Sequence, residues 1–461
     1  MFEALRSPFR LAFMGRLMLL VAISFAFVAR PALAQSILRD AETEALLRDI
    51  SKPIIEASGL RPQDVQVVLI NDQTVNAFVA QGQVVYLHSG LITVAGNANE
   101  VQGVVAHELG HIVGGHVIRS GEGARQATSI SLLSLLLGAA AIAAGAGEAG
   151  MAVLSMGQQA ALGSFLSFTR TQEASADAAG ASFLGRSGIS GRGSLAFFAR
   201  LQNEEFRLNI PQEDSYARTH PLNGERIAML ENVYRNDPAW DRPTDPALEE
   251  RFQRVKAKLI GYVQRPERVL QTYPESDRSM PARYARAYAY HRQSHPERAI
   301  AEADSLLRDR PGDPYFLELR GQILLESGRP AEALESLRAA VAGAPDQPLI
   351  SVLLSHALIA TEDPGNFEEA ERVLRAAVGR DNTNPFAWYQ LGIVYDRAGD
   401  SARAQLATAE RYNLIGQPQL ALASAEQAMM GLNVGTPDWL RAQDIAMVSR
   451  TEAERQRRER R

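Results

Sequence analysis

The sequence from Val104 to His111 reads Val-Val-Ala-His-Glu-Leu-Gly-His and places two histidines four residues apart, with a glutamate beside the first. Residues four apart share one face of an α-helix, so the imidazoles of His107 and His111 can reach one ion. Glu108 projects to the adjacent side, where a carboxylate can take a proton from an attacking water and pass it to a departing amine. The pattern predicts a metal-dependent hydrolytic centre, and the alternative is a buried helix with two structural histidines.

The helix that carries this motif is expected to be buried, because apolar residues recur along it from Val101 to Ile112. Asn99, with Gln102 three residues later, resembles a capping box that opens the helix. His116 faces largely away from the other two histidines on the same helix, so we leave it out of the predicted centre.

A third ligand is expected in the segment from Arg170 to Asp177, where Glu173 and Asp177 again stand four apart. Glu173 could bind zinc while Asp177 orients one of the ligand imidazoles. A solvated acidic helix face is the alternative interpretation of the same spacing.

Composition limits the kinds of site that the chain can carry. It has 461 residues, no cysteine and a formal net charge of -5. The length indicates two or more globular domains. Thiolate metal sites, disulfides and cysteine nucleophiles are excluded, and the small negative charge argues against a nucleic-acid partner.

The N-terminus predicts a cleaved export signal. Three arginines precede an apolar run from Leu17 to Ala29, and Ala32-Leu33-Ala34 offers the small residues that signal peptidase requires. The run is shorter than the roughly 20 residues needed to span a bilayer, which disfavours a retained anchor. Cleavage after Ala34 would deliver a chain that begins at Gln35 to the periplasm.

The stretch from Ile130 to Phe168 is rich in Leu, Ala and Gly, and residues 132–147 contain no charge. A membrane hairpin is one interpretation. Because several glycines weaken a helix and Glu148 interrupts the run, a mobile helical hairpin that covers the cleft or touches a partner is favoured.

Small residues recur in the second half of the chain at a spacing typical of tetratricopeptide repeats. Ala299, Ala333, Ala370 and Ala404 lie about 34 to 37 residues apart. Before them, a Pro-rich passage marks the end of the first domain. The expected organisation is a signal peptide over 1–34, a zinc metallopeptidase domain over 35–240, a helical linker over 241–280, the repeats over 281–435 and a polar C-terminal tail over 436–461.

The motif from His107 to His111, the box from Glu173 to Asp177 and Thr219-His220-Pro221 with Arg226 together resemble the HtpX and CAAX-prenyl-endopeptidase family of metallopeptidases. The resemblance implies one catalytic zinc on His107, His111 and Glu173, with Glu108 as the general base.

The same resemblance implies that Asn76 and Phe78 border the cleft, where an extended substrate could add a strand through main-chain hydrogen bonds. His220 precedes a proline, which biases its backbone towards extended geometry. Its imidazole could donate to the oxyanion and assist catalysis, or occupy the open zinc position and silence it.

We therefore expect a mainly α protein in which an α+β, gluzincin-like metallopeptidase domain precedes a tetratricopeptide α-solenoid. The export signal and repeats resemble the periplasmic members of the family. This implies that the enzyme cleaves misfolded or stalled outer-membrane β-barrel precursors, with the β-barrel assembly machinery as a partner. The rivals are a chaperone or assembly adaptor with a mostly closed site, and an integral-membrane, HtpX-like protease; peripheral membrane contact is also open.

Overall fold

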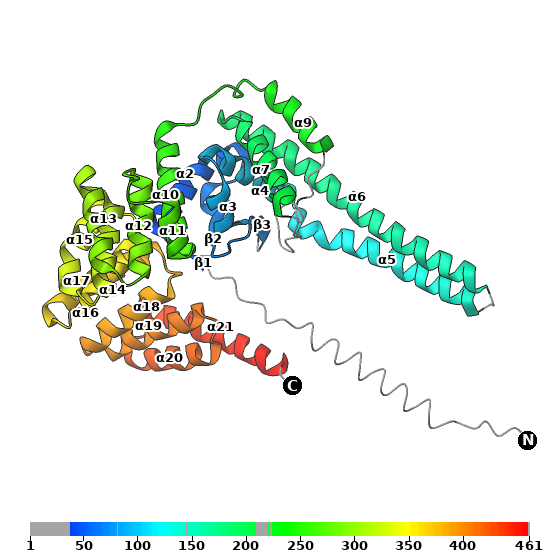
Figure 1. The fold of residues 1–461 in the computed structure, drawn as a ribbon. Helices are drawn as coiled ribbons and strands as arrows, with labels where there is room; N and C mark the ends of the chain where they lie inside the picture. The colour runs from blue at the N-terminus through cyan, green and yellow to red at the C-terminus, as the bar shows by residue number, and fades with distance from the viewer. Residues whose placement is uncertain (1–36, 81, 144–145, 209–219, 221–223, 460–461) are drawn as a thin grey trace, which may run out of the picture. The chain divides into compact units, whose positions relative to one another are not determined.

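The computed structural model describes residues 37–80, 82–143, 146–208, 220 and 224–459 (Figure 1). The expected signal peptide over 1–34, with its cleavage point, lies outside the described residues. The remainder is mainly helical with one small sheet, followed by paired helices. This confirms the predicted fold class.

The β-branched runs of the first half form the sheet. Two of its strands are β2 (Gln66–Ile70) and β4 (Val84–His88), which pair in parallel with Val67 opposite Val85. Strand β3 (Ala77–Ala80) runs antiparallel to β4. The strand order is β1-β2-β4-β3, where β1 is Ile37–Leu38, so β3 is an edge strand of this sheet.

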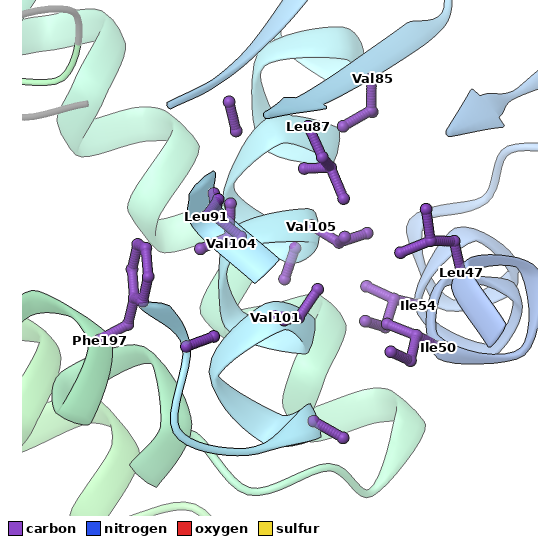
Figure 2. Packing of buried hydrophobic residues seen from close by; sticks show 14 of the residues in the cluster. Leu47, Ile50, Ile54, Val85, Leu87, Leu91, Val101, Val104, Val105 and Phe197 are labelled. Carbon is purple, nitrogen blue, oxygen red and sulfur yellow. The ribbon is translucent and has the colours of Figure 1, made fainter. Parts of the chain in front are cut away.

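The largest hydrophobic cluster of the N-terminal half, called the first core below, contains buried residues from Leu46 to Leu259. The motif helix α4 (Ala98–Val113) lies at its centre. Figure 2 shows its Val101, Val104 and Val105 among side chains from helix α2 (Ala41–Ser58), strand β4 and helix α7 (Arg192–Leu208). Each of these valines is almost completely buried, and burying such a side chain contributes about 1.5–3 kcal/mol. The packing therefore fixes the helix that carries the two histidines. The remaining elements of this region are η1 (Pro62–Asp64), α3 (Ser89–Val94) and α9 (Gly224–Arg235).

The N-terminus of α4 differs from the prediction. Asn97 is the N-cap and its side chain accepts from the backbone N–H of Glu100, whose carboxylate accepts in turn from Gly96 N. Asn99 instead donates to Ser190 O and accepts from Gly193 N. The predicted cap at Asn99 was wrong by two residues, because that side chain joins α4 to Ser190 and to Gly193 in the first turn of α7.

The apolar stretch forms two long helices, α5 (His116–Ala143) and α6 (Gly147–Ser187), which run side by side (Figure 1). By length and composition, His116–Ile142 would suffice to cross a membrane. The C-terminal part of α6 enters the first core, where Ala181, Phe183 and Leu184 are buried. This last part carries Glu173 and Asp177 towards α4.

The second half of the chain consists of helices that pack in sequence order. Ala299, Ala333 and Ala370 are completely buried and Ala404 is nearly so, as expected for the contact positions of helix pairs. The helices are α10 (Pro246–Val263), α11 (Pro266–Thr272), α12 (Met280–Arg292), α13 (Pro296–Asp309), α14 (Pro314–Glu326), α15 (Pro330–Gly343), α16 (Pro348–Ala360), η2 (Pro364–Asn366), α17 (Phe367–Arg380), α18 (Pro385–Arg397), α19 (Ser401–Leu414), α20 (Pro418–Gly431) and α21 (Pro437–Glu459).

The C-terminal segment also differs from the expectation. Residues 436–461 were predicted as a polar tail, yet Pro437–Glu459 form α21. Its Ala442, Ile445 and Ala446 are buried against α19 and α20. The charged residues that dominate the composition concentrate at the end of the helix, so composition hid a short apolar seam.

Candidate metal centre

The two motif histidines meet at one point on α4. Their Nε2 atoms lie 3.1 Å apart, and both side chains are buried. Glu108, between them in sequence, is completely buried. The predicted i, i+4 geometry is present in the structure.

Glu173 of α6 approaches both histidines. Its Oε2 lies 3.4 Å from His107 Nε2, and its Oε1 lies 3.4 Å from His111 Nε2. These separations match ligand atoms that face a common ion, since metal–ligand bonds of about 2.0–2.2 Å place neighbouring ligands a little over 3 Å apart.

His220 completes the cluster. Its Nδ1 lies 3.2 Å from His107 Nε2 and 3.1 Å from Glu173 Oε1. One ligand atom from each of His107, His111, Glu173 and His220 lies within 4.8 Å of the other three. The other ring nitrogen of His220, Nε2, lies 3.4 Å from Glu108 Oε1. The geometry thus brings together all four predicted residues that could contact an ion.

Backbone packing, rather than the ligands, sets the distance between α4 and α6. A Cβ on Gly110 would lie 2.5 Å from Ala176 O, and a Cβ on Gly180 would lie 3.0 Å from Ala106 O. Only glycine allows the two helices to approach this closely. The contact brings the Glu173 carboxylate within reach of the histidines.

Asp177, the second acidic residue of the predicted pair, contacts the first histidine of the motif. His107 Nδ1 donates to Asp177 Oδ1 at 2.9 Å, which leaves Nε2 directed at the cluster. Arg226 of α9 donates to the same carboxylate, with Nε 2.7 Å from Oδ2, and its Nη2 lies 3.1 Å from Glu173 Oε2. The buried guanidinium therefore holds both acidic side chains.

His116 was missed by the sequence prediction. Its Nδ1 lies 2.9 Å from Nδ1 of His111, and its Nε2 lies 3.0 Å from Ser175 Oγ, which donates to Gln172 O. With His111 presenting Nε2 to the cluster, the His111 Nδ1–H donates to His116 and the His116 Nε2–H donates to Ser175.

The chain turns between His111 and His116, which explains why the prediction failed for His116. Gly115 has a φ of 63°, which ends α4 and turns the chain before α5 begins at His116. The two glycines at positions 114 and 115 were the available signal of this break. On an unbroken helix His116 would have pointed elsewhere.

The charges of the centre suit a divalent cation. Glu108, Glu173, Asp177 and Arg226 are all buried, and in their ionised forms the three carboxylates would bring three negative charges against one positive charge. With neutral histidines the net charge is about −2, which is costly in a buried site unless a cation balances it. Two or three imidazoles with a carboxylate form a donor set that zinc and several other divalent ions accept.

Without a metal ion, the pKa values of these groups follow from the same excess of negative charge. Burial disfavours the charged form of His107, but Asp177 and Glu173 outweigh burial and raise its pKa to about 10. Burial, with His107 and His220 close by, lowers the pKa of His111 to about 2. Burial opposes ionisation of Glu173, yet His107 and His220 hold its pKa well below its ordinary range. A proton on His107 thus partly balances charge that a metal ion could balance.

The predicted substrate residues lie at the edge strand beside this cluster. His220 Nε2 is 3.3 Å from Ala77 O at the start of β3. Phe78 stacks on Tyr86 with ring centroids 5.1 Å apart and is partly exposed. Asn76 is buried, and its Oδ1 accepts from Ala77 N, so its side chain shapes the start of the strand.

Residues 41–234, which include every residue of the cluster, match the model of peptidase family M48. Residues 41–234 are a peptidase family M48 domain. The HtpX and CAAX-prenyl-endopeptidase family, which the sequence resembles, lies within family M48. Residues 284–348 and 363–428 match a tetratricopeptide repeat model, which confirms the predicted repeats.

Curated relatives agree with this assignment. Beta-barrel assembly-enhancing proteases of Yersinia pestis and Escherichia coli (strain K12) are each 26% identical to this chain, over 80% of this chain and 75% of the relative. Metalloprotease LoiP of Escherichia coli (strain K12) is 31% identical over 37% of this chain and 62% of LoiP. The chain is a metalloendopeptidase that carries tetratricopeptide repeats, as the sequence predicted.

Proposed function

We propose that this M48 protein is a periplasmic zinc metalloendopeptidase that cleaves misfolded or stalled outer-membrane β-barrel precursors. The observation that carries the enzymatic part is the convergence of His107, His111, Glu173 and His220 beside the buried Glu108. The N-terminal sequence supports export. The likeness to beta-barrel assembly-enhancing proteases supports the substrate class.

His107, His111 and Glu173 would hold the ion, as the resemblance implied. When bound, zinc lowers the pKa of water and polarises a scissile carbonyl. Glu108, shielded from solvent beside the ligand atoms, is placed to accept the proton of the attacking water and transfer it to the leaving nitrogen. Asp177 and Arg226 keep His107 in the tautomer that presents Nε2.

The edge strand β3 is the proposed substrate platform. In the described sheet its second edge carries no neighbouring strand, and an extended peptide can pair there through main-chain hydrogen bonds. Ala77 O lies beside His220, so a peptide on this edge would pass close to the ligand cluster. In this arrangement Phe78 offers a side-chain contact, and Asn76 acts by fixing the strand rather than by touching substrate.

We assign His220 to the fourth ligand position in a resting state, rather than to oxyanion binding. Its Nδ1 is as close to His107 and Glu173 as those ligands are to each other. A catalytic zinc site needs an open position for water or substrate. With an ion bound, cleavage would therefore need the His220 imidazole to move away, which would also break the contact of its Nε2 with Glu108.

This closed arrangement favours a second candidate function, that of a chaperone or assembly adaptor whose repeats do most of the work. The repeats would recruit substrates or the β-barrel assembly machinery.

The proposed domain limits are 35–240 for the peptidase domain and 281–435 for the repeats. Helix α10, within the proposed linker over 241–280, packs Phe252 and Val255 into the first core and so joins the two parts.

Metal content measured on the purified mature chain is the first test. We expect about one zinc per wild-type chain and its loss in Glu173→Ala under the same dialysis. Glu108→Gln should keep the metal but reduce cleavage of an unfolded β-barrel protein by about 100-fold or more. His220→Ala should keep the metal and increase cleavage. Absence of zinc from both wild type and Glu173→Ala would contradict the zinc enzyme.

The two candidate functions separate in cells. If Glu108→Gln abolishes cleavage but preserves outer-membrane integrity in a strain that depends on this protein, the adaptor function is the main one. If integrity fails together with cleavage while the protein level is unchanged, proteolysis is the main function.

A further inference from the structure

In the hairpin of α5 and α6, small residues are buried and most large apolar residues are exposed, which is the reverse of a helix pair in a water-soluble protein. Among the described residues from 119 to 169, every buried residue is Gly, Ser or Ala: Gly123, Ser134, Gly138, Gly150, Gly157 and Ala161. Leu154 and Phe168 are half-buried and lie against Gly138 and Gly123, but most of the large apolar side chains point outward. Leu133 is 58% exposed, and Leu136 and Met156 are each 69% exposed.

The seam between the two helices depends on these small residues. A Cβ on Gly138 would lie 2.6 Å from Leu154 Cγ and 2.9 Å from Gly150 O, and a Cβ on Gly157 would lie about 2 Å from the side chain of Ser134. Small residues that let helix backbones approach closely are typical of helix pairs in lipid, where large apolar side chains gain nothing by turning inward. In water the same arrangement leaves the apolar surface unburied.

The outward apolar surface is broad rather than a single stripe. Leu132, Leu133, Leu135, Leu136 and Leu137 are all more than half exposed. At about 100° per residue they cover most of the circumference of α5 that the seam leaves free. A partner protein groove takes a stripe of roughly 100°, whereas lipid can contact a wide arc.

Charge distribution matches a lipid surface as well. Residues 126–147 and 149–169 contain no Asp, Glu, Lys or Arg. Where the apolar part ends, Arg119, Arg125 and Arg170 are exposed, with Glu122 as the acidic residue among them. Arginines next to an apolar segment attract anionic phosphates at the edge of the hydrocarbon layer.

We propose that residues 126–143 and 146–169 form a docking hairpin that inserts into the outer layer of an anionic phospholipid bilayer without spanning it. Glu148 at the turn and the exposed pair Gln158 and Gln159 are too polar for the middle of the hydrocarbon layer. The hairpin therefore lies at the interface, with its leucines and methionines among the acyl chains and its polar residues at headgroup level. This inference does not rest on the proposed peptidase function, because binding needs neither metal nor cleavage.

Vesicle flotation of the mature chain tests the proposal. The wild type should float with phosphatidylcholine vesicles that contain phosphatidylglycerol, and less with phosphatidylcholine alone. Leu133→Gln combined with Leu136→Gln should lower binding at least about tenfold. The matched control combines Leu420→Gln and Leu440→Gln, two leucines of the repeats that are 48% and 47% exposed, and should bind as wild type does. Helicity by circular dichroism should be unchanged in both variants, because all four side chains are exposed.

A second measurement reports the location directly. Tryptophan at position 136, introduced as Leu136→Trp, should be quenched by lipid-borne quenchers, and Leu420→Trp should not. Wild-type chain that stays with the protein fraction, or equal loss of binding in the control double variant, would overturn the proposal. Bound chain that resists alkaline extraction would overturn peripheral insertion in favour of a membrane span.

Discussion

Arg226 of α9 and Asp177 of α6 form a buried two-point ion pair, with Nε 2.7 Å from Oδ2 and Nη2 3.0 Å from Oδ1. The same carboxylate accepts from His107, so the pair fixes a histidine of the cluster without touching the proposed ion. Paired in this way, a buried carboxylate stays ionised, and the pKa of Asp177 is lowered despite burial because His107 and Arg226 bind it.

Removing the guanidinium should therefore be costly. Arg226→Gln is expected to lower the free energy of unfolding by about 3–5 kcal/mol, because it leaves Asp177 and Glu173 buried without their cation. Arg226→Lys should recover part of this loss, since it keeps the charge but not the two-point geometry. Urea unfolding measures both. Arg235→Gln, which breaks an exposed pair with Glu231 on the same helix, should cost less than about 1 kcal/mol.

His116 should control metal affinity through His111. His116→Ala is expected to weaken zinc binding about 10- to 100-fold, measured by competition with a chelator, because the His111 Nδ1–H loses its acceptor. His116→Asn should recover much of the affinity by offering an oxygen near the position of Nδ1. His295→Ala, which removes an exposed histidine of the repeats, is the control. Equal affinities in all three variants would show that His116 has no positioning role.

Gly110 should tolerate no side chain. Gly110→Ala is expected to destabilise the fold by about 1–3 kcal/mol and to weaken zinc binding, because the new methyl group would push α6 away from α4. Gly379→Ala, at a helical position with open space around the added carbon, should instead be neutral or stabilise by up to about 1 kcal/mol. If the contact is tight, thermal unfolding should show lower stability for Gly110→Ala and equal or higher stability for Gly379→Ala. Metal titration should show weaker zinc binding for Gly110→Ala alone.

Glu318 of α14 should make stability depend on pH. Its Oε2 is buried without a hydrogen-bond partner among the described residues. Burial, with Asp40 and Glu42 nearby, outweighs Lys258 and raises the pKa of Glu318 from 4.5 to about 8. The folded chain thus binds a proton that the unfolded chain has released, and this contribution to stability falls as the pH rises from 4.5 to about 8.

Glu318→Gln should remove this part of the pH dependence. Relative to wild type, the variant is expected to gain stability at pH 8 and to change little near pH 4.5, as urea unfolding over this range would record. Glu335→Gln, at an exposed position of α15, is the control and should keep the wild-type slope. An unchanged slope in Glu318→Gln would mean that the carboxyl group is already ionised in the folded chain.

The sequence predicted most of the centre because its chemistry follows helical periodicity. His107, His111, Glu173 and Asp177 are two pairs spaced by four residues, and the structure brings both pairs together. His220 depended on the resemblance, since no periodicity links it to the others. That four-residue spacing holds only within one helix, which is why His116, beyond the break at Gly115, was missed.

Fold features that depend on long-range partners were harder to predict. Asn99 carries the residue type of a helix cap, but a contact with Ser190 uses its side chain elsewhere. The segment after Pro437 was judged by its charged end, while its buried alanines became apparent only with α19 and α20 in place. In both cases the prediction used a local sequence pattern, whereas a tertiary contact determined the structure.

The backbone contact of Gly110 with Ala176 involves no ligand atom, so the spacing of the centre exists before any ion arrives. A small metal finger collapses when its ion is stripped, but this chain should stay folded and gain stability only by mass action as ion is added. Metal-starved cells would then hold a reserve of dormant, correctly shaped protein. Supplying ion would load this reserve with metal, with no new synthesis and no refolding, and only the departure of His220 would then remain before cleavage.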